Sequence, residues 1–313
     1  MNPVRRAVID VGTNSVKLLV AEVDAREVRP VLEKSEQTRL GRGFYETHCL
    51  QAEAIAGTAE AVGKFTRLAA QWEVPAPRII GTSAARDAIN REELVAALER
   101  ASGQRVEIIS GEEEADLVFR GVTTDSNLAG QRLLILDVGG GSTEFILGAG
   151  GHHTFRQSFD LGSVRLHEML RPADPPSLAD LAGCRGWLGE FFARQIAPAL
   201  GVALGGAGAP ETRLVGTGGT TTILARMQLR LDSFDRGRIE GARLTREQVL
   251  DQMVHLWSLS LEERRKIIGL PSSRADIILM GVAIYEAVME HFHFPEVYVS
   301  TRGLRYGAVL GNP

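Results

Sequence analysis

Two segments of the sequence combine an aspartate with a run of small and hydroxyl-bearing residues, a combination suited to holding phosphate. They read Asp10-Val-Gly-Thr-Asn-Ser and Asp137-Val-Gly-Gly-Gly-Ser-Thr-Glu. Tight turns of such residues present backbone N–H groups and hydroxyls to phosphate oxygens. Either segment alone fits an ordinary hairpin turn, but the aspartate in the same place in both favours phosphate binding. The candidate phosphate-binding residues are Gly12, Thr13, Asn14 and Ser15 in the first turn and Gly139, Gly140, Gly141 and Ser142 in the second.

The aspartates suggest a cation beside the phosphate, because a carboxylate repels phosphate but can hold a divalent ion or a water next to it. Glu144 follows Asp137 by seven residues. In a hairpin that turns at 139–142, these two carboxylates return near each other. The pair predicts a site for Mg²⁺ or another divalent cation, with Asp10 as a further candidate ligand. The alternative is that Glu144 faces solvent on the second strand.

A third glycine-rich segment follows an apolar strand and opens a predicted helix. Backbone N–H groups at a helix N-terminus bind phosphate readily, although such a turn can also mark a close backbone crossing without a ligand. Its candidate phosphate-binding residues are Gly216, Thr217, Gly218 and Gly219.

Two further segments could supply chemistry. Residues 110–116, Ser-Gly-Glu-Glu-Glu-Ala-Asp, open a helix after an apolar strand. Acidic residues in a first helical turn are explained by the helix dipole, yet a glutamate here could also take a proton from water. Arg86 follows another strand, where it could bind phosphate through its guanidinium fork; a surface ion pair with Asp87 or Glu92 is about equally favoured. Arg165, Arg302 and Arg305 are weaker candidates, and the His-Phe-His at 291–293 fits a structural role better than a metal site.

An internal repeat must position these residues. Residues 7–20 and 134–147 align at an offset of 127, which superimposes Asp10 on Asp137. Each copy predicts a hairpin, a third strand, a helix, a fourth strand and a final strand that runs into a helix, so the same order of elements occurs twice. The turn-rich segment 121–131 marks the boundary between the halves, 201–211 is a predicted surface connector, and 245–291 is a predicted helical insertion.

The composition argues against several classes of protein. The chain has 313 residues, 44% hydrophobic and 24% charged, which fits two globular domains. The net charge of −4 argues against a general nucleic-acid binder. No stretch approaches the roughly 18 apolar residues of a membrane span, and no signal peptide is evident. The two cysteines cannot form a disulfide framework, so we expect a cytoplasmic protein.

With these motifs in this order, the chain resembles the exopolyphosphatase/guanosine pentaphosphatase (Ppx/GppA) phosphatases of the actin, Hsp70 and sugar-kinase superfamily. The resemblance runs through AVIDVGTNSVKLLV, GTSAARDA, ISGEEEADLVFRGV, LLILDVGGGSTEFILG, LGSVRL, LVGTGGTTT, GLPSSRADII and STRGLRYGAVL. It implies an α/β fold of two actin-like (ribonuclease H-like) domains with mixed five-stranded sheets and an active site in the cleft between them. The domains would cover 1–125 and 126–300, with a C-terminal helix at about 301–313 packing back on the first.

The resemblance also assigns roles. It makes Glu114 the general base, Asp137 and Glu144 the carboxylates that hold a metal or orient water, and Arg86 a contact to substrate phosphates. It implies a homodimer. Long members of the family carry further C-terminal helical domains that line a channel for long chains, whereas this sequence stops at Pro313. We therefore expect shorter chains, or another phosphoanhydride, as substrates.

The predicted activity is Mg²⁺-dependent hydrolysis of the terminal phosphoanhydride of inorganic polyphosphate, with release of orthophosphate. Hydrolysis of guanosine pentaphosphate is the nearest alternative, because the chemistry is the same with a different leaving group. Phosphoryl transfer to another acceptor and a polyphosphate- or nucleotide-sensing scaffold are the remaining alternatives. No nucleic-acid or membrane partner is expected.

Overall fold

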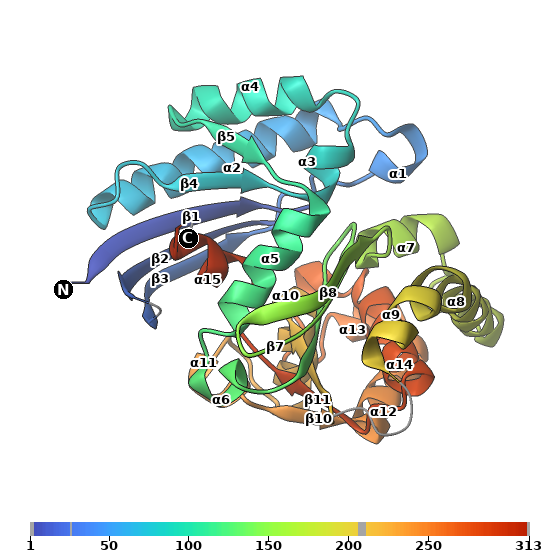
Figure 1. The fold of residues 1–313 in the computed structure, drawn as a ribbon. Coiled ribbons are helices and arrows are strands. Elements are labelled where there is room, and N and C mark those ends of the chain that lie inside the picture. Colours follow the sequence, from blue (N-terminus) through green and yellow to red (C-terminus); the bar gives the residue numbers. More distant parts are fainter. Residues whose placement is uncertain (1–2, 26, 206–210, 312–313) are drawn as a thin grey trace. The chain divides into compact units, whose positions relative to one another are not determined.

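A computed structural model describes residues 3–25, 27–205 and 211–311 (Figure 1). By their internal contacts the residues divide into two compact units. The first comprises Met1–Ser126, Gly140–Ser142 and Arg302–Pro313, and the second comprises Asn127–Gly139 and Thr143–Thr301. The chain thus changes unit within the segment 121–131, where polar and turn-forming residues replace the apolar periodicity.

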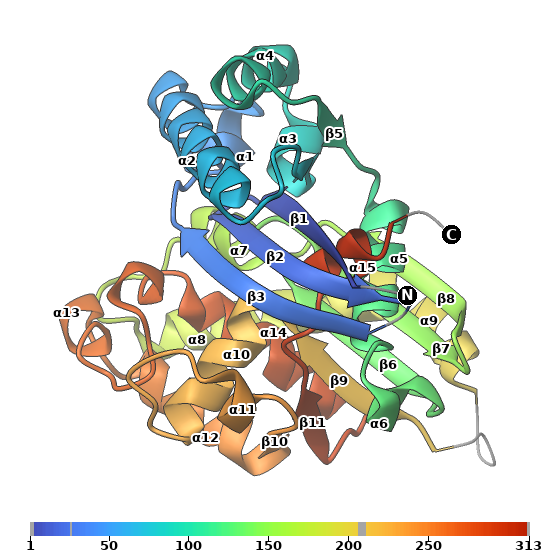
Figure 2. The same ribbon diagram turned by 90° about the vertical axis from the view of Figure 1, so that its left-hand side faces the viewer.

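The first unit is built on a five-stranded mixed sheet in the order β3-β2-β1-β4-β5. Three strands form an antiparallel meander, and β4 and β5 add parallel to its β1 edge. The meander is seen along its twisted length in Figure 2. The strands are β1 (Val4–Val11), β2 (Val16–Asp24), β3 (Glu27–Glu36), β4 (Arg78–Gly81) and β5 (Val106–Ile108).

Helices cover both faces of this sheet (Figure 1). Alternate residues of β1, including Ile9 and Val11, pack with α2 and α4 in one apolar cluster. The opposite face carries α5 and α15, of which α15 contacts both β1 and β2. The helices are α1 (Phe44–Thr47), α2 (Ala52–Gln71), α3 (Ser83–Asp87), α4 (Arg91–Ser102), α5 (Gly111–Val122) and α15 (Leu304–Val309), and α6 (Ser126–Ala129) lies at the boundary between the units.

Two glycines let α5 and α15 cross backbone to backbone. A Cβ atom at Gly307 would lie 1.9 Å from the carbonyl oxygen of Leu117, and one at Gly121 would lie 2.2 Å from that of Gly303. Real Cβ atoms do not approach so closely, so no larger residue fits either position without moving a helix. The crossing packs the C-terminal helix against the helix that carries Glu114.

The second unit repeats this topology on a sheet in the order β10-β11-β9-β6-β7-β8. The mixed α/β architecture expected from the sequence is confirmed, with one addition. The resemblance implied five strands, but β10 pairs antiparallel with β11 and makes a sixth, anchored by the buried Leu244. The strands are β6 (Leu133–Val138), β7 (Thr143–Ala149), β8 (His152–Phe159), β9 (Arg213–Thr217), β10 (Arg243–Thr245) and β11 (Glu296–Val299).

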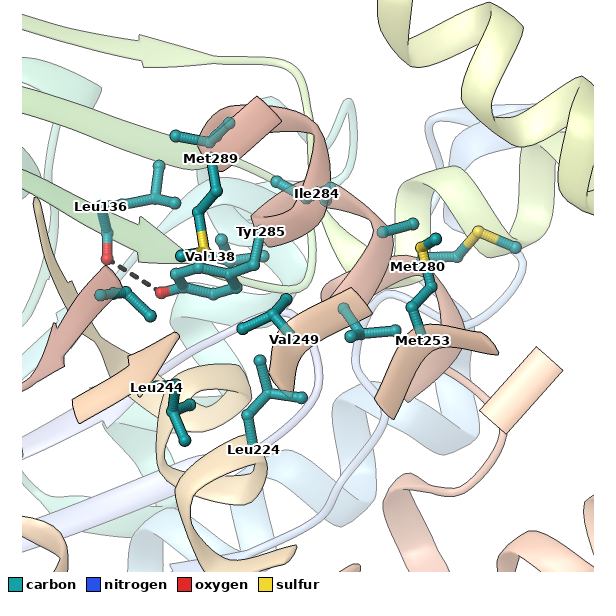
Figure 3. Close-up of a cluster of buried hydrophobic side chains, with 14 of the residues drawn as sticks. Leu136, Val138, Leu224, Leu244, Val249, Met253, Met280, Ile284, Tyr285 and Met289 are labelled. Carbon is teal, nitrogen blue, oxygen red and sulfur yellow. Dashed lines mark hydrogen bonds between the residues drawn. The ribbon is translucent and has the colours of Figure 1, made fainter. Parts of the chain in front are cut away.

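Its helices form the larger of the two apolar cores. Figure 3 shows Tyr285 of α14 at the centre, among aliphatic and methionine side chains. The expected helix at 177–200 is interrupted by a π-helical turn at Phe192–Ile196. The helices are α7 (Ser163–Leu170), α8 (Leu178–Phe191), α9 (Ala197–Leu204), α10 (Gly218–Gln228), α11 (Arg236–Ile239), α12 (Arg246–Trp257), α13 (Leu261–Arg264) and α14 (Ile278–His291), with a 3₁₀ turn at Ser272–Arg274.

Two regional predictions have mixed outcomes. The segment 245–291 is largely helical, as predicted. The predicted connector 201–211 is helical up to Leu204, and residues 206–210 lie outside the described residues. Among the described helices, none combines the length and apolar character needed to cross a bilayer.

Candidate active site

The β1–β2 turn is a compact, largely buried loop. Gly12 N donates to Ser15 O at 3.1 Å, and the carbonyl oxygens of Thr13 and Asn14 accept from backbone N–H groups of residues 39–41. The side chain of Asn14 accepts from Gln37 Nε2 at 3.2 Å through Oδ1. Its buried Nδ2 has no hydrogen-bond partner among the described residues. A buried amide donor without an acceptor is unfavourable, and a phosphate oxygen would satisfy it.

Three residues of the second predicted phosphate turn, Gly140–Ser142, belong to the first unit. At Gly141 a Cβ would lie 2.3 Å from Ser83 Oγ and 2.9 Å from Thr13 Oγ1. Only glycine leaves this space open. Ser83 Oγ is buried without a hydrogen-bond partner among the described residues. The structure thus places the hydroxyls of Thr13 from the first turn and Ser83 from α3 beside Gly141 of the second turn, and Ser83 is a residue that the sequence analysis missed.

Glu114 is the buried member of the three consecutive glutamates that begin α5. Ser110 and Glu113 form a reciprocal capping box, so Glu113 turns back to the helix start, while Glu112 is exposed. Glu114 Oε2 lies 3.2 Å from Arg86 Nη1, in an ion pair whose two side chains are only 11% and 21% exposed. The predicted general base and the predicted phosphate-binding arginine are therefore held together.

The ion-pair interpretation of Arg86 is confirmed for Asp87 but not for Glu92, and its contact to phosphate stays a prediction. Its Nε lies 3.2 Å from Asp87 Oδ1, whereas Glu92 pairs with Arg91 instead. The weaker arginine candidates have structural partners. Arg165 pairs with Asp160, Arg302 donates to Thr124, and Arg305 pairs with Glu33 and donates to Leu18 O. His291 makes ring contacts with Phe192 and Phe292, which fits the structural role expected for it.

Asp137 and Glu144 meet as predicted. They are direct partners in the antiparallel register of β6 and β7, with four residues, 139–142, between the strands. Directly opposed residues project to the same face of a sheet, so the two carboxylates are neighbours. Glu144 is 1% exposed, and its Oε1 accepts a hydrogen bond of 2.7 Å from Ser158 Oγ on β8. The alternative interpretation, in which Glu144 faces solvent, is therefore wrong.

Ser158 is a positioning residue that no motif in the sequence indicates. Ser158→Ala is expected to leave the fold intact and to weaken apparent divalent-cation affinity by roughly tenfold, because residues that orient a metal-binding carboxylate typically change affinity about 10–100-fold. Cation titrations of activity measure this change. The control is Thr154→Ala on the same strand. It removes a hydroxyl that, among the described residues, donates to Leu147 O rather than to a carboxylate. Equal cation dependence in both variants would contradict the role of Ser158.

The first repeat differs from the second in the residue that lies opposite its aspartate. Lys17 stands opposite Asp10 on β1 and β2, where the second repeat has Glu144 opposite Asp137. Burial raises the pKa of Asp10, and the positive charges of Lys17 and Arg305 oppose this rise. Asp10 is thus balanced by cationic side chains, whereas the carboxylate pair lies in the second unit. The same offset of 127 that revealed the repeat could have revealed this asymmetry.

The third glycine-rich loop lies against Asp137. Thr217 is the parallel partner of Asp137, and Gly218 follows with φ +84°. A Cβ at Gly218 would lie 2.1 Å from Asp137 Oδ1. Tyr285 links α10 to the strand that carries Asp137. Its hydroxyl bonds Thr221 on α10 and donates to Leu136 O at 3.2 Å, next to Asp137 (Figure 3). Burial raises the pKa of Tyr285, as does the charge of Asp137.

Gly218→Ala tests this contact. Alanine at a left-handed position is expected to lower the free energy of unfolding by about 1–2 kcal/mol, and its methyl group must displace the Asp137 carboxylate, so activity falls as well. Gly219→Ala is the matched control for stability, because its Cβ would meet only Arg274 Nη2 at an ordinary 3.8 Å. Thermal or denaturant unfolding of both variants gives the comparison. If the two variants were equally stable, neither the left-handed backbone of Gly218 nor its close approach to Asp137 would restrict the residue at this position.

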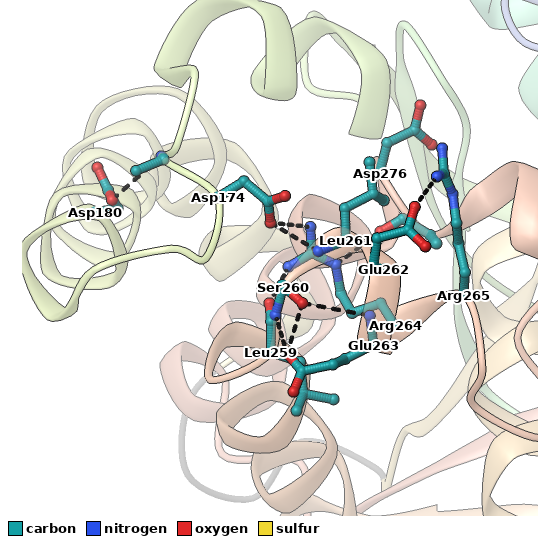
Figure 4. A network of polar contacts seen from close by, with 12 residues as sticks. Asp174, Asp180, Leu259, Ser260, Leu261, Glu262, Glu263, Arg264, Arg265 and Asp276 are labelled. Carbon is teal, nitrogen blue, oxygen red and sulfur yellow. Dashed lines mark hydrogen bonds and ion pairs between the residues drawn. The ribbon is translucent and has the colours of Figure 1, made fainter.

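Arg274 is a cationic residue beside this loop that the sequence analysis did not single out, although it lies in the quoted motif GLPSSRADII. Its neighbourhood is held by the buried Arg264, which donates to Ala275 O at 2.9 Å and to Leu259 O at 2.6 Å (Figure 4). Asp174 Oδ1 lies 3.8 Å from Arg264 and accepts from Leu261 N. This network anchors the segment that carries Arg274.

The donor set at the carboxylate pair fits a magnesium-type cation. Among the described residues no group of three His, Cys, Asp or Glu side chains could hold a metal by itself. Mg²⁺ is commonly bound by one or two carboxylates, with waters and substrate phosphates completing its shell. Asp137 and Glu144 would hold such an ion; Asp10 belongs to the first unit.

The model of the Ppx/GppA phosphatase family matches residues 19–312 of this chain. The chain belongs to the Ppx/GppA phosphatase family. It is therefore an enzyme of the exopolyphosphatase type, and the resemblance found in its motifs is confirmed. The match includes the strand that carries Asp137 and the helix that carries Glu114.

Individual members of the Ppx/GppA family are similar over nearly the whole chain. Exopolyphosphatase 2 of Mycobacterium tuberculosis is 33% identical over 299 residues, which cover 90% of this chain and 89% of that protein. An exopolyphosphatase structure from Cytophaga hutchinsonii has a TM-score of 0.87 at 26% identity, covering 97% of this chain and 96% of that one. A Ppx/GppA structure from Aquifex aeolicus has a TM-score of 0.79 at 29% identity, covering 98% and 97%.

Proposed function

We propose that this Ppx/GppA phosphatase is an exopolyphosphatase, which hydrolyses the terminal phosphoanhydride of inorganic polyphosphate in a reaction that needs a divalent cation. The observation that carries the proposal is the buried Glu114 carboxylate, held by Arg86 in the unit that also contains the buried β1–β2 turn. The likeness to a curated exopolyphosphatase over 90% of the chain supports the choice of substrate.

Glu114 serves as the acceptor for the proton of the attacking water. As the water oxygen bonds to the terminal phosphorus, the bond from phosphorus to the bridging oxygen breaks, which yields orthophosphate and a chain shorter by one phosphate. Arg86 holds the Glu114 carboxylate in place through their ion pair, and its guanidinium can also contact a phosphate. A strong base is not needed, because phosphoryl transfer proceeds through a loose transition state that positioning and charge stabilise.

The remaining groups hold phosphate. In the first unit, Asn14 Nδ2 and Ser83 Oγ are two of the buried polar atoms that lack a hydrogen-bond partner among the described residues, and phosphate oxygens are suitable acceptors. In the second unit, Asp137 and Glu144 would hold Mg²⁺, which when bound neutralises charge on bridging and terminal oxygens.

Phosphate release by the purified protein tests the proposal. Polyphosphates of graded length, guanosine pentaphosphate, and polyphosphate with ADP are supplied in parallel, with and without Mg²⁺. The proposal predicts metal-dependent orthophosphate release from polyphosphate at a higher kcat/KM than from guanosine pentaphosphate. Preference for guanosine pentaphosphate, or formation of ATP from ADP, would replace it with one of the alternative activities. Light scattering of the same preparation tests the homodimer that we also propose.

A further inference from the structure

A separate cavity of about 510 Å³ lies in the second unit, at the C-terminal end of α10. Its volume falls in the range of small-molecule sites, about 300–1,000 Å³. We call it the α10–α12 pocket. Its walls come from the end of α10, from the last turns of α12 and from the segment after α13. The lining residues are Met227, Gln228, Arg230, Gln252, His255, Leu256, Lys266, Ile267 and Ile268.

One side of the α10–α12 pocket is apolar. Met227, Leu256 and Ile267 pack against or belong to the apolar core of the unit, and Ile268 remains 44% exposed at the surface. A continuous aliphatic and thioether wall of this kind accommodates the flat face of a ring system, and methionine sulfur makes favourable contacts with aromatic rings. The wall therefore favours a ligand with a planar, largely apolar part.

A fixed pair of amides lies beside this wall. Gln252 Nε2 donates to Leu224 O at 3.2 Å and to Gln228 Oε1 at 3.1 Å. Because the Leu224 carbonyl can only accept, the orientation of both amides is determined. The amide N–H₂ of Gln228 and a second lone pair of its oxygen then form a donor–acceptor edge. Gln252 Oε1 is buried without a donor among the described residues, so the pair is incomplete as it stands.

Two cationic side chains complete the lining, and it includes no Asp or Glu. Arg230 and Lys266 are exposed, and within the described part of the chain neither forms a direct ion pair with a carboxylate. The pKa of the nearby Glu263 is lowered mainly by hydrogen bonds from Ser260, and the charge of Lys266 lowers it further. The single arginines of α8 and α12, by contrast, are both in direct ion pairs, Arg185 with Glu286 and Arg246 with Glu290. Unpaired cations beside an apolar wall favour a ligand that carries negative charge.

We propose that the α10–α12 pocket binds a purine nucleotide. The base lies on the apolar wall, and its hydrogen-bonding edge meets the donor–acceptor edge of Gln228, because a glutamine amide matches the adjacent donor and acceptor atoms of a purine. The phosphates lie at Arg230 and Lys266. None of the residues that line this pocket is among those to which the proposed function assigns phosphate binding or hydrolysis.

Photolabelling of the full-length protein with 8-azido-ADP and 8-azido-GDP tests the location, and equilibrium dialysis with ADP and GDP measures affinity. Excess tripolyphosphate is added throughout to block nucleotide phosphates from the phosphate-binding turns. The expected label lies on peptides that contain residues 227–230 or 266–268. Lys266→Ser and Gln228→Leu are each expected to weaken binding about tenfold, the scale of one charge-assisted or well-oriented polar contact.

Lys34→Ser is the matched control, since it removes an exposed lysine from the first unit. It should bind nucleotide like the unmodified protein. The proposal would be overturned if no label formed in the presence of tripolyphosphate, or if the label lay outside the named peptides. Equal affinity of Lys266→Ser and Lys34→Ser for the nucleotide would overturn it as well. Equal binding of a pyrimidine nucleotide such as UDP would refute purine recognition. Polyphosphate hydrolysis measured on the same preparations reports separately on the proposed function.

Discussion

Glu114→Gln is expected to lower kcat for polyphosphate by about 10²–10⁴-fold, the usual range for loss of a general base, with little change in substrate affinity. Glutamine keeps the size of the side chain and one oxygen for the contact with Arg86 at 3.2 Å. It cannot accept a proton from water. The loss should therefore appear in turnover, whereas binding, which depends on the phosphate turns and on Arg86, should persist.

The neighbouring glutamate offers a close control. Glu113→Gln removes the same charge from the same helical turn, and glutamine can still complete the capping box with Ser110. Steady-state phosphate release gives kcat, and equilibrium binding of polyphosphate gives affinity. Similar turnover in the Glu114 and Glu113 variants would show that Glu114 does not act as the base. A loss of binding in Glu114→Gln alone would instead assign it a role in holding substrate.

Asp137→Asn is expected to reduce activity by about 10²–10³-fold, comparable to the loss of one preorganised charge-stabilising group, and to raise the Mg²⁺ concentration needed for half-maximal rate. Asparagine fits the same space against Gly218, so the loop should remain in place. The lost negative charge weakens cation binding at the pair formed with Glu144. Part of the lost rate should then return at high Mg²⁺ or with Mn²⁺.

Asp160→Asn is the corresponding control, because Asp160 is an exposed aspartate that forms an ion pair with Arg165 at 2.9 Å. Activity measured as a function of Mg²⁺ concentration separates the two variants. An unchanged cation requirement in Asp137→Asn, with lowered kcat, would place Asp137 in water orientation rather than in metal binding. Unchanged kcat and cation requirement together would remove Asp137 from the site.

Much of the architecture could be predicted from local pattern. The repeat predicted the paired hairpins, and strand geometry then determined that Asp137 faces Glu144, since a four-residue turn brings the residues seven apart into register. The sixth strand β10 was missed because three residues, Arg243-Leu-Thr, carry too little alternation to distinguish a strand from the start of a helix.

The roles within the acidic run needed the folded chain. The spacing of Ser110 and Glu113 is that of a capping box, yet Ser-Gly-Glu-Glu-Glu alone cannot show which glutamate is buried. Packing of α5 against the sheet and α15 turns Glu114 inward, toward Arg86, and leaves Glu112 in solvent. Likewise, no spacing rule connects Glu144 to Ser158, because the pairing of β7 with β8 depends on the register of the whole meander.

The sequence by itself therefore determined the strand-end carboxylates, the glycine-rich turns and the family, because these depend on residue type and on short, regular spacings along the chain. Only the tertiary structure decided that Ser158 bonds Glu144, that Gly218 must be glycine to clear a carboxylate, and that Arg274 reaches the third loop. The physical reason is that side-chain burial and charge pairing are set by neighbours far away in sequence, which local spacing does not encode.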